Sequence, residues 1–193
     1  MEIRDLNPER WDDLVKLFGT KGACGGCWCM WWRIERGERW AEVKGASARR
    51  RMKSLVQSGR ALGALAYVDG EPVGWVSYGP RKEYPRLDRA PSLRCDDAER
   101  VWSVPCFFIK AGHRGQGVAS ALLEHAVRRI HALGGKIAEG YPVKRAKDGK
   151  PLPGAFAWTG TRPMFDAQGF EVVGNRDGGK QRVRLELPRR GGV

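Results

Sequence analysis

The 193-residue sequence predicts one domain, over residues 1–193, of the α/β (α+β) class with a mixed β-sheet. Two runs of strand-forming residues flank a turn signal at 69–71, which is typical of a β-hairpin. Between residues 118 and 133, apolar side chains recur at helical spacing and charged side chains occupy the other side. Strand-forming runs at 101–109 and 136–141 flank this amphipathic helix, which implies a parallel strand pair joined by a helical crossover.

The N-terminal part is expected to supply a strand, two helices and the hairpin. Asn7 and Pro8 are typical of a helix start, because Asn caps free amides and Pro is tolerated in the first turn. Gly19 and Gly22 are expected to stop that helix. The expected elements are a strand at 1–4, the helix that starts at 7–8, a basic helix at 47–57, and hairpin strands at 61–68 and 72–78.

The C-terminal part is expected to begin with a long loop and an interrupted strand. Residues 80–100 are dense in Pro, Arg and Asp, and they predict a surface loop with one helical turn near 96–100. Pro105 cannot donate to a strand ladder, so it implies an edge or a bulge in the strand at 101–109. The later expected elements are a strand at 136–141, a basic loop at 144–154, a short helix at 159–168, and strands at 170–174 and 181–187 around the turn 177–179.

The chain is strongly basic, with 35 Lys and Arg against 22 Asp and Glu, a net charge of +13. Such a field attracts nucleic acid, an anionic membrane or a polyanionic cofactor, and charge alone does not choose among them. The basic residues are spread along the chain, which favours an ordinary solvated surface. Because no apolar run is long enough for a membrane span and the N-terminus lacks signal-peptide order, we expect a soluble, cytoplasmic protein with no membrane partner.

Five cysteines occupy an unusual pattern, with three of them within six residues at 24, 27 and 29. An odd number in this spacing is a poor disulfide framework, so reduced thiols are expected. Cys24 and Cys27 resemble half of a zinc site, but only Cys95, Cys106 or His113 remain to complete it and none forms a second pair. We therefore expect no metal.

The most informative segment joins the strand at 101–109 to the amphipathic helix. Gly115 and Gly117 let the backbone pass close to a ligand, and the first amides of a helix have no internal partners. Together with the helix dipole, these amides predict an anion site that suits a pyrophosphate. The alternative is an ordinary glycine-rich connection. No phosphate-binding G-x-x-x-x-G-K-[ST] sequence is present, and no G-x-G-x-x-G follows a strand.

The pattern Arg114-x-x-Gly117-x-Ala119, placed between a strand and a helix, resembles the acyl-CoA loop of the GNAT acetyltransferase superfamily. The order of the expected elements is similar, and Gly169-Phe170 matches another position typical of that family. The resemblance implies a GNAT fold: a mixed central sheet of six to seven strands with about four helices and a splayed pair of parallel strands. It also implies an acyl-CoA-dependent N-acyltransferase.

The resemblance implies that acetyl-CoA is the acyl donor and that this loop holds its pyrophosphate. The expected pyrophosphate ligands are the backbone amides of Arg114, Gly115, Gln116, Gly117, Val118 and Ala119. The pantetheine arm is expected to pair with Phe107, Phe108 and Ile109, beside a bulge for which Pro105 is a sensible cause. An amide near Ile109 is expected to polarise the thioester carbonyl.

Amine acetylation needs a neutral amine, a polarised carbonyl and a proton for the thiolate. Strand alternation puts Glu139 and Tyr141 on one face, so we expect Glu139 as general base, unless it only binds a cationic substrate or caps the strand end. Many GNAT enzymes have a Tyr acid four residues before the Gly-Phe pair, where this chain has Phe165. That departure leaves Tyr141, a water molecule, or no acid at all.

The acceptor is expected to be a small-molecule amine, attacked directly in a ternary complex. Trp28, Trp31 and Trp32, with Trp40 further on, lie where GNAT proteins build the acceptor site, and Arg33 is expected to pair with an acidic group of the ligand. The alternative for the tryptophans is core filling. Cys106, beside the pantetheine strand, raises a covalent acetyl-cysteine route, but direct transfer is preferred because cysteine is more often a small buried apolar residue.

Two other functions remain as alternatives. One is a protein N-acetyltransferase. The basic surface argues against basic peptide tails as its substrates. The other is a basic nucleic-acid-binding module, which predicts binding that collapses with salt and ignores acetyl-CoA. We disfavour nucleic acid as a partner, and the sequence leaves open whether the protein is a homodimer.

Overall fold

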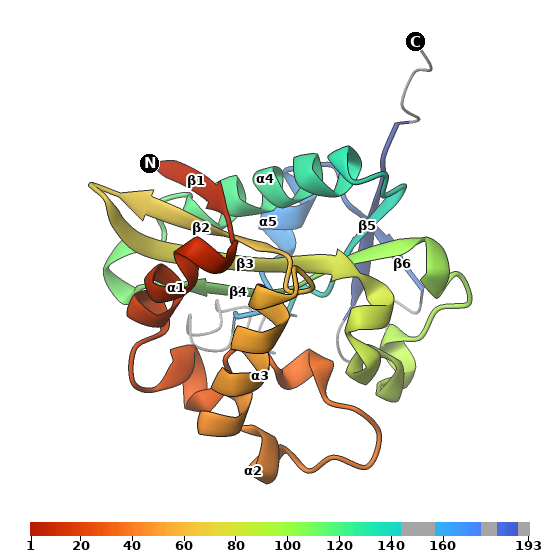
Figure 1. Cartoon of the computed structure of the whole chain (residues 1–193). Coiled ribbons are helices and arrows are strands. Elements are labelled where there is room, and N and C mark those ends of the chain that lie inside the picture. The colour runs from red at the N-terminus through yellow and green to blue at the C-terminus, as the bar shows by residue number, and fades with distance from the viewer. Residues whose placement is uncertain (144–156, 175–180, 189–193) are drawn as a thin grey trace, which may run out of the picture.

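The computed structural model describes residues 1–143, 157–174 and 181–188, and within them seven strands form one mixed sheet in the order β1-β2-β3-β4-β5-β7-β6 (Figure 1). β4 and β5 are parallel, and the other neighbouring pairs are antiparallel. The α/β class, the hairpin and the crossover are therefore confirmed. The strands are β1 Glu2–Asp5, β2 Gly63–Val68, β3 Glu71–Pro80, β4 Val101–Ile109, β5 Ile137–Gly140, β6 Glu171–Val173 and β7 Arg182–Glu186.

Five α-helices occur in the described part of the chain, against about four expected: α1 Trp11–Phe18, α2 Trp40–Val43, α3 Ala46–Gln57, α4 Val118–Ala132 and α5 Arg162–Asp166. The Asn7 side chain caps the first turn by accepting from the amide of Arg10 at 3.1 Å, as the sequence indicates. The expected basic loop at 144–154 and turn at 177–179 lie outside the described residues.

The sheet is covered on both faces, with α4 on one side and α1 and α3 on the other (Figure 1). The apolar stripe of α4 packs against the inner face of β2, β3 and β4, where Leu122, Leu123 and Ile130 are fully buried. The opposite core is aromatic and includes Trp28 and Trp75. None of the described helices has the length and apolar character needed to span a membrane.

The segment between β3 and β4 is more ordered than its composition predicts. It forms four 3-10 turns at Arg81–Glu83, Pro85–Arg89, Pro91–Leu93 and Ala98–Arg100. The last turn confirms the helical turn expected near 96–100. Tyr84, Leu87 and Leu93 are buried and form a third core with Trp32 and Tyr141. The expectation of a plain surface loop was therefore wrong, because isolated apolar residues among Pro and Arg carry no periodic signal.

β4 carries a bulge at the position of Pro105. Ser77 of β3 pairs with Cys106, but Gly79 pairs with Ser103, so three residues of β4 advance against two of β3. The indole N–H of Trp32 donates to the buried carbonyl of Pro105 at 3.1 Å. β5 pairs with β4 only as far as Val104, and the strands then separate. This geometry confirms the expected bulge and the splayed parallel pair.

The bond from Trp32 to the bulge predicts a measurable contribution to stability. Trp32→Phe keeps a ring but removes the donor, and leaving a buried carbonyl unpaired costs about 1–3 kcal/mol. We expect the free energy of unfolding, measured in urea, to fall by about that amount. Trp102→Phe, the same change in side chain on β4, is the control. An equal loss in both variants would show that ring size, not the hydrogen bond, is responsible.

Candidate active site

The loop between β4 and α4 exposes backbone amides at the start of the helix. The first helical bond runs from the amide of Ala121 to the carbonyl of Gly117 at 3.0 Å, so the amides of residues 118–120 precede the ladder. Gly115 and Gly117 have positive φ angles of 74° and 81°, and a Cβ added to either would meet nothing within 4 Å. No acidic residue lies in the first turn of α4. The loop is therefore an open anion seat at the positive end of a helix dipole.

A groove of about 300 Å³ leads from this loop along the splayed part of β4. Five of the predicted cofactor residues line it together: Phe107, Phe108, Ile109, Arg114 and Ala119. The further lining residues are Ala23, Cys24, Ala157, Trp158, Gly160, Thr161 and Met164. The groove is thus continuous with the anion seat.

The other predicted loop residues contribute in different ways. Val118 is the first residue of α4 and its side chain is buried, so only its backbone amide is available to the seat. Gln116 is exposed, and its side-chain amide donates to the carbonyl of Gly112 at 2.9 Å. Arg114 donates from Nε to the carbonyl of Ile109 at 3.0 Å, which ties the loop to the end of β4.

The backbone of β4 presents donors to the groove on its open side. The amide of Phe107 donates to the carbonyl of Trp158 at 2.7 Å, whereas the amide of Lys110 donates to Val73 on β3 at 2.9 Å. Because successive amides of a strand alternate in direction, the amide of Ile109 points to the same open side as that of Phe107. Ile109 therefore offers the groove a backbone donor at the end of the strand.

A second cavity of about 290 Å³ adjoins the groove. It is strongly apolar, and ten residues line it: Ala23, Cys24, Cys27, Cys29, Trp31, Trp40, Cys106, Phe107, Phe108 and Trp158. Five of these, including Phe107 and Phe108, also line the groove. The two spaces therefore meet at the splayed part of β4.

GNAT acetyltransferases hold coenzyme A with a bent strand, an open helix start and a groove between them. The acetyltransferase (GNAT) family matches residues 28–139 of this chain. The chain belongs to the GNAT acetyltransferase family. Acetyl-CoA is the acyl donor of this family, whose members act on amine acceptors. The open loop glycines and the amides ahead of the α4 ladder fit its diphosphate.

Solved structures show the same fold at low sequence identity. The ribosomal-protein-alanine N-acetyltransferase from Brucella melitensis is 14% identical with a TM-score of 0.56, covering 97% of this chain and 100% of that one. The yncA structure from Salmonella typhimurium, solved with its cofactor acetyl-CoA, is 13% identical with a TM-score of 0.56, covering 99% and 96%. An aminoglycoside 6'-acetyltransferase type Ii is 14% identical with a TM-score of 0.56, covering 98% and 100%. No curated protein matches the chain in sequence.

Of the four residues predicted to bind the acceptor in this GNAT domain, Trp31 lines the second cavity, and Trp40 joins it. Trp28 is 4% exposed and stacks on Trp11 in the aromatic core, so it supports the fold instead. Trp32 holds the bulge, as described above, and lies 5.5 Å from the ring of Trp158. The expected acceptor wall is thus only partly supported, because indole rings also serve the core and the strand.

Arg33 is not placed to bind an acidic ligand in the second cavity. Its side chain is 5% exposed and donates from Nη1 to Glu83 at 3.1 Å and from Nη2 to the Tyr84 hydroxyl at 3.3 Å. Its guanidinium also lies 4.5 Å from the centre of the Tyr84 ring. These contacts use its charge to anchor the segment after β3, which overturns the expected ligand role.

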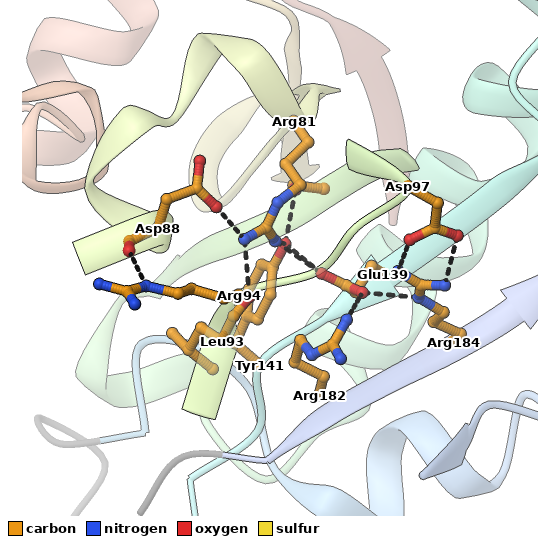
Figure 2. Close-up of polar contacts among 10 residues, drawn as sticks. Arg81, Asp88, Leu93, Arg94, Asp97, Glu139, Tyr141, Arg182 and Arg184 are labelled. Atoms are coloured by element: carbon orange, nitrogen blue, oxygen red, sulfur yellow. Dashed lines mark hydrogen bonds and ion pairs between the residues drawn. The ribbon is translucent and has the colours of Figure 1, made fainter. Parts of the chain in front are cut away.

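Glu139 lies in a buried ion network and not in the groove (Figure 2). Its side chain has no exposed surface; Oε1 accepts from Arg81 Nη1 at 2.7 Å, and Oε2 accepts from Arg184 Nε at 2.7 Å and Arg182 Nη1 at 3.2 Å. Arg184 also forms two bonds to Asp97. Because both carboxylate oxygens are occupied by guanidinium groups and the side chain does not line the groove, the geometry contradicts a general base role for Glu139.

Tyr141 belongs to the same network. Its hydroxyl donates to Glu139 Oε1 at 2.9 Å, accepts from Arg81 Nη1 at 2.9 Å, and lies 2.6 Å from the Ser103 hydroxyl. The expected proximity of Glu139 and Tyr141 is therefore confirmed. Burial, followed by the Glu139 carboxylate, raises the pKa of the Tyr141 hydroxyl well above its ordinary value, which opposes proton donation to a thiolate. No pattern in the sequence indicates the three arginine partners, because they come from distant segments.

Phe165 lies in the core behind Phe107, a residue that lines both cavities. Phe165 is fully buried, with its ring 6.2 Å from Phe107 and 5.1 Å from Phe170, so it packs the core where other GNAT enzymes have a Tyr.

The five cysteines form no disulfide, and the Sγ atoms of Cys29 and Cys106 lie 3.3 Å apart. Burial raises the pKa of Cys27 to about 12, so its thiol stays protonated. Among the described residues, no group of three or more potential ligands is placed to hold a metal ion.

The ion network predicts a structural and not a catalytic phenotype for Glu139→Gln. Removing the charge of the carboxylate that three guanidinium groups share leaves buried charge uncompensated, which costs about 3–5 kcal/mol. We expect that loss in the free energy of unfolding measured with urea. Glu124→Gln, which breaks the exposed pair with Arg128, is the control and should cost about 0.5 kcal/mol. Unchanged stability with a large drop in turnover would restore Glu139 as a base.

Proposed function

We propose that this protein transfers the acetyl group of acetyl-CoA to the amine of a small molecule, by direct attack in a ternary complex. One observation supports this most: the groove that begins at the anion seat meets an apolar cavity at Phe107 and Phe108, beside the separated strands. A donor in the groove and an acceptor in the cavity would bring their reacting atoms together at that junction. Proximity of this kind is a major source of rate enhancement.

The chain's own backbone supplies the contacts for the donor. The amides from Gly115 to Ala119 bind the diphosphate, because the amide of Arg114 already donates to the carbonyl of Ala111 at 3.4 Å. The open side of Phe107 to Ile109 receives the pantetheine arm. Because the Trp158 carbonyl already occupies the Phe107 amide, the amide of Ile109 is the donor left to polarise the thioester carbonyl. A fixed amide aimed at the developing oxyanion stabilises the transition state more than the ground state.

The reaction then needs little help from side chains. The amine lone pair forms the new C–N bond, the C–S bond breaks, and the thiolate leaves. A thiol has a pKa of about 8.5, so its thiolate is a fair leaving group near neutrality, and the proton lost by nitrogen passes to it through water. Glu139 and Tyr141 take no part, because the network holds both away from the groove.

The cavity favours a small molecule over a protein acceptor. Its volume of about 290 Å³ lies at the lower end of small-ligand sites. The net charge of +13 disfavours the lysine-rich tails that protein acetyltransferases modify. Five thiols without a disulfide suit a reducing compartment, so we place this single-domain enzyme in the cytoplasm.

Gly117→Glu tests the anion seat. The new carboxylate would project from the seat itself, and like-charge contact with the diphosphate costs several kcal/mol, so we expect acetyl-CoA affinity to fall about 100-fold or more. Calorimetric titration measures it. The matched control is Gly134→Glu at the other end of α4, where φ is +87° and an added Cβ also meets nothing within 4 Å. Equal affinity in both variants, or tight salt-sensitive binding of nucleic acid without acetyl-CoA binding, would reject the proposal.

A further inference from the structure

The second cavity is built from flat rings whose positions are fixed. The rings of Trp31 and Trp40 meet edge to face with centres 5.2 Å apart. The guanidinium of Arg86, which does not line the cavity, lies 3.6 Å from the centre of the Trp31 ring. Cation–π contact of this kind holds a half-buried ring in one orientation. With Phe108 and Trp158 on the other walls, the cavity presents aromatic surfaces to whatever enters it.

None of the ten described residues that line this cavity carries a charge. Cysteine has an ordinary pKa of about 8.5, so an unperturbed thiol is mostly neutral near pH 7, and burial raises the pKa of the Cys27 thiol to about 12. The two charged residues that the sequence suggested for the acceptor site are engaged elsewhere, since Arg33 pairs with Glu83 and Glu139 is enclosed by arginines. The lining therefore offers a ligand neither a counter-ion nor a group to remove a proton.

This lining discriminates between kinds of amine. An alkylamine is an ammonium ion near neutral pH, and burying it without a partner costs far more than burying a neutral group. It would also have to lose a proton before attack, and no carboxylate or histidine is among the described residues that line the cavity. An amine attached to an aromatic ring is neutral at pH 7, because its lone pair is shared with the ring, and it still attacks a thioester.

We propose that the acceptor is an arylamine, held between the walls formed by Trp31, Trp40, Phe108 and Trp158. The proposal rests on the proposed function above and specifies its substrate class. A dry cavity of about 150 Å³ holds a benzene ring, so 290 Å³ accommodates one substituted ring or a fused pair. Polyamines and aminoglycosides are excluded, because their several charges and hydroxyls would lose water without replacement hydrogen bonds.

The chemistry balances without another reactant. The aryl nitrogen forms a bond to the thioester carbon, the C–S bond breaks with its electron pair on sulfur, and one N–H proton ends on that sulfur. The products are an aryl acetamide and coenzyme A thiol. Release of the thiol is the natural readout, since it reports every acceptor on one scale.

The experiment compares two isomers, para-toluidine and benzylamine, with spermidine as a polycationic probe, using the purified full chain and acetyl-CoA. We expect kcat/KM for para-toluidine to exceed that for benzylamine by about 100-fold at pH 7 and to stay flat from pH 6.5 to 8.5. Benzylamine turnover should rise about tenfold per pH unit, as its neutral form becomes more abundant. Preference for benzylamine or spermidine at pH 7 would overturn the arylamine assignment.

Cys24, which is exposed at the edge of both cavities, allows a charge to be introduced there without disturbing the core. Cys24→Asp places a carboxylate beside the acceptor and should shift the ratio of the two kcat/KM values toward benzylamine about fivefold, the equivalent of a partly exposed ion pair. The isosteric Cys24→Asn should leave the ratio unchanged. An equal shift of this ratio in both variants, or no shift in either, would contradict the proposal that the second cavity is an uncharged acceptor site.

Failure of the substrate class and failure of the function give different results. If acetyl-CoA binds in calorimetry and another amine class is acetylated, the arylamine proposal falls and the proposed function stands. If acetyl-CoA does not bind, or binds without thiol release for every amine, the proposed function falls and the substrate class falls with it.

Discussion

One additional residue in β4, at Val104–Pro105, determines how the rest of this protein is arranged. Where β4 and β5 run side by side they pair in register, from Val101 with Ile137 to Val104 with Gly140. Past the bulge the strands part, and the backbone amides of Phe107 and Ile109 turn toward a groove instead of a neighbouring strand. Because proline has no amide to donate, the chain loses nothing in the ladder at the point where it bends. The indole of Trp32 then secures the bulge by its carbonyl.

The buried ions lie next to this separation and explain how the sheet remains a single body around it. Glu139, on the last paired stretch of β5, joins Arg81 from the end of β3 to Arg182 and Arg184 of β7 (Figure 2). With Asp88 and Asp97, the network holds three cations and three anions, so its formal charge is balanced. Burial opposes charge on Arg81, but its anionic partners prevail and raise the pKa of its guanidinium above the ordinary value. The strands are thus linked by charge where they begin to lose their backbone pairing.

The sequence predicted what local physics controls and failed where distant segments meet. Residues 118–133 repeat apolar side chains at helical spacing, and the glycines before them mark an open helix start, so α4 and the free amides at its start were predictable. Pro105 revealed the bulge because it removes a donor. The expectation for Glu139 was wrong because strand alternation predicts the face of the sheet on which a side chain lies, but not which arginines from other segments contact it there. The ligand-binding roles predicted for Trp28, Trp32 and Arg33 were wrong for the same reason. These residue types suit ligand binding, core packing and anchoring equally, and only the fold assigns each role. The buried Tyr84 and Leu93 were missed because 3-10 turns have no strong periodic pattern.

The most direct test of this account is a crystal structure of the protein with coenzyme A. We expect the diphosphate within hydrogen-bonding distance of the amides from Gly115 to Ala119, and the pantetheine arm beside Phe107–Ile109 with the bulge unchanged. A structure in which β4 and β5 pair beyond Val104, or in which the diphosphate lies away from the start of α4, would contradict it.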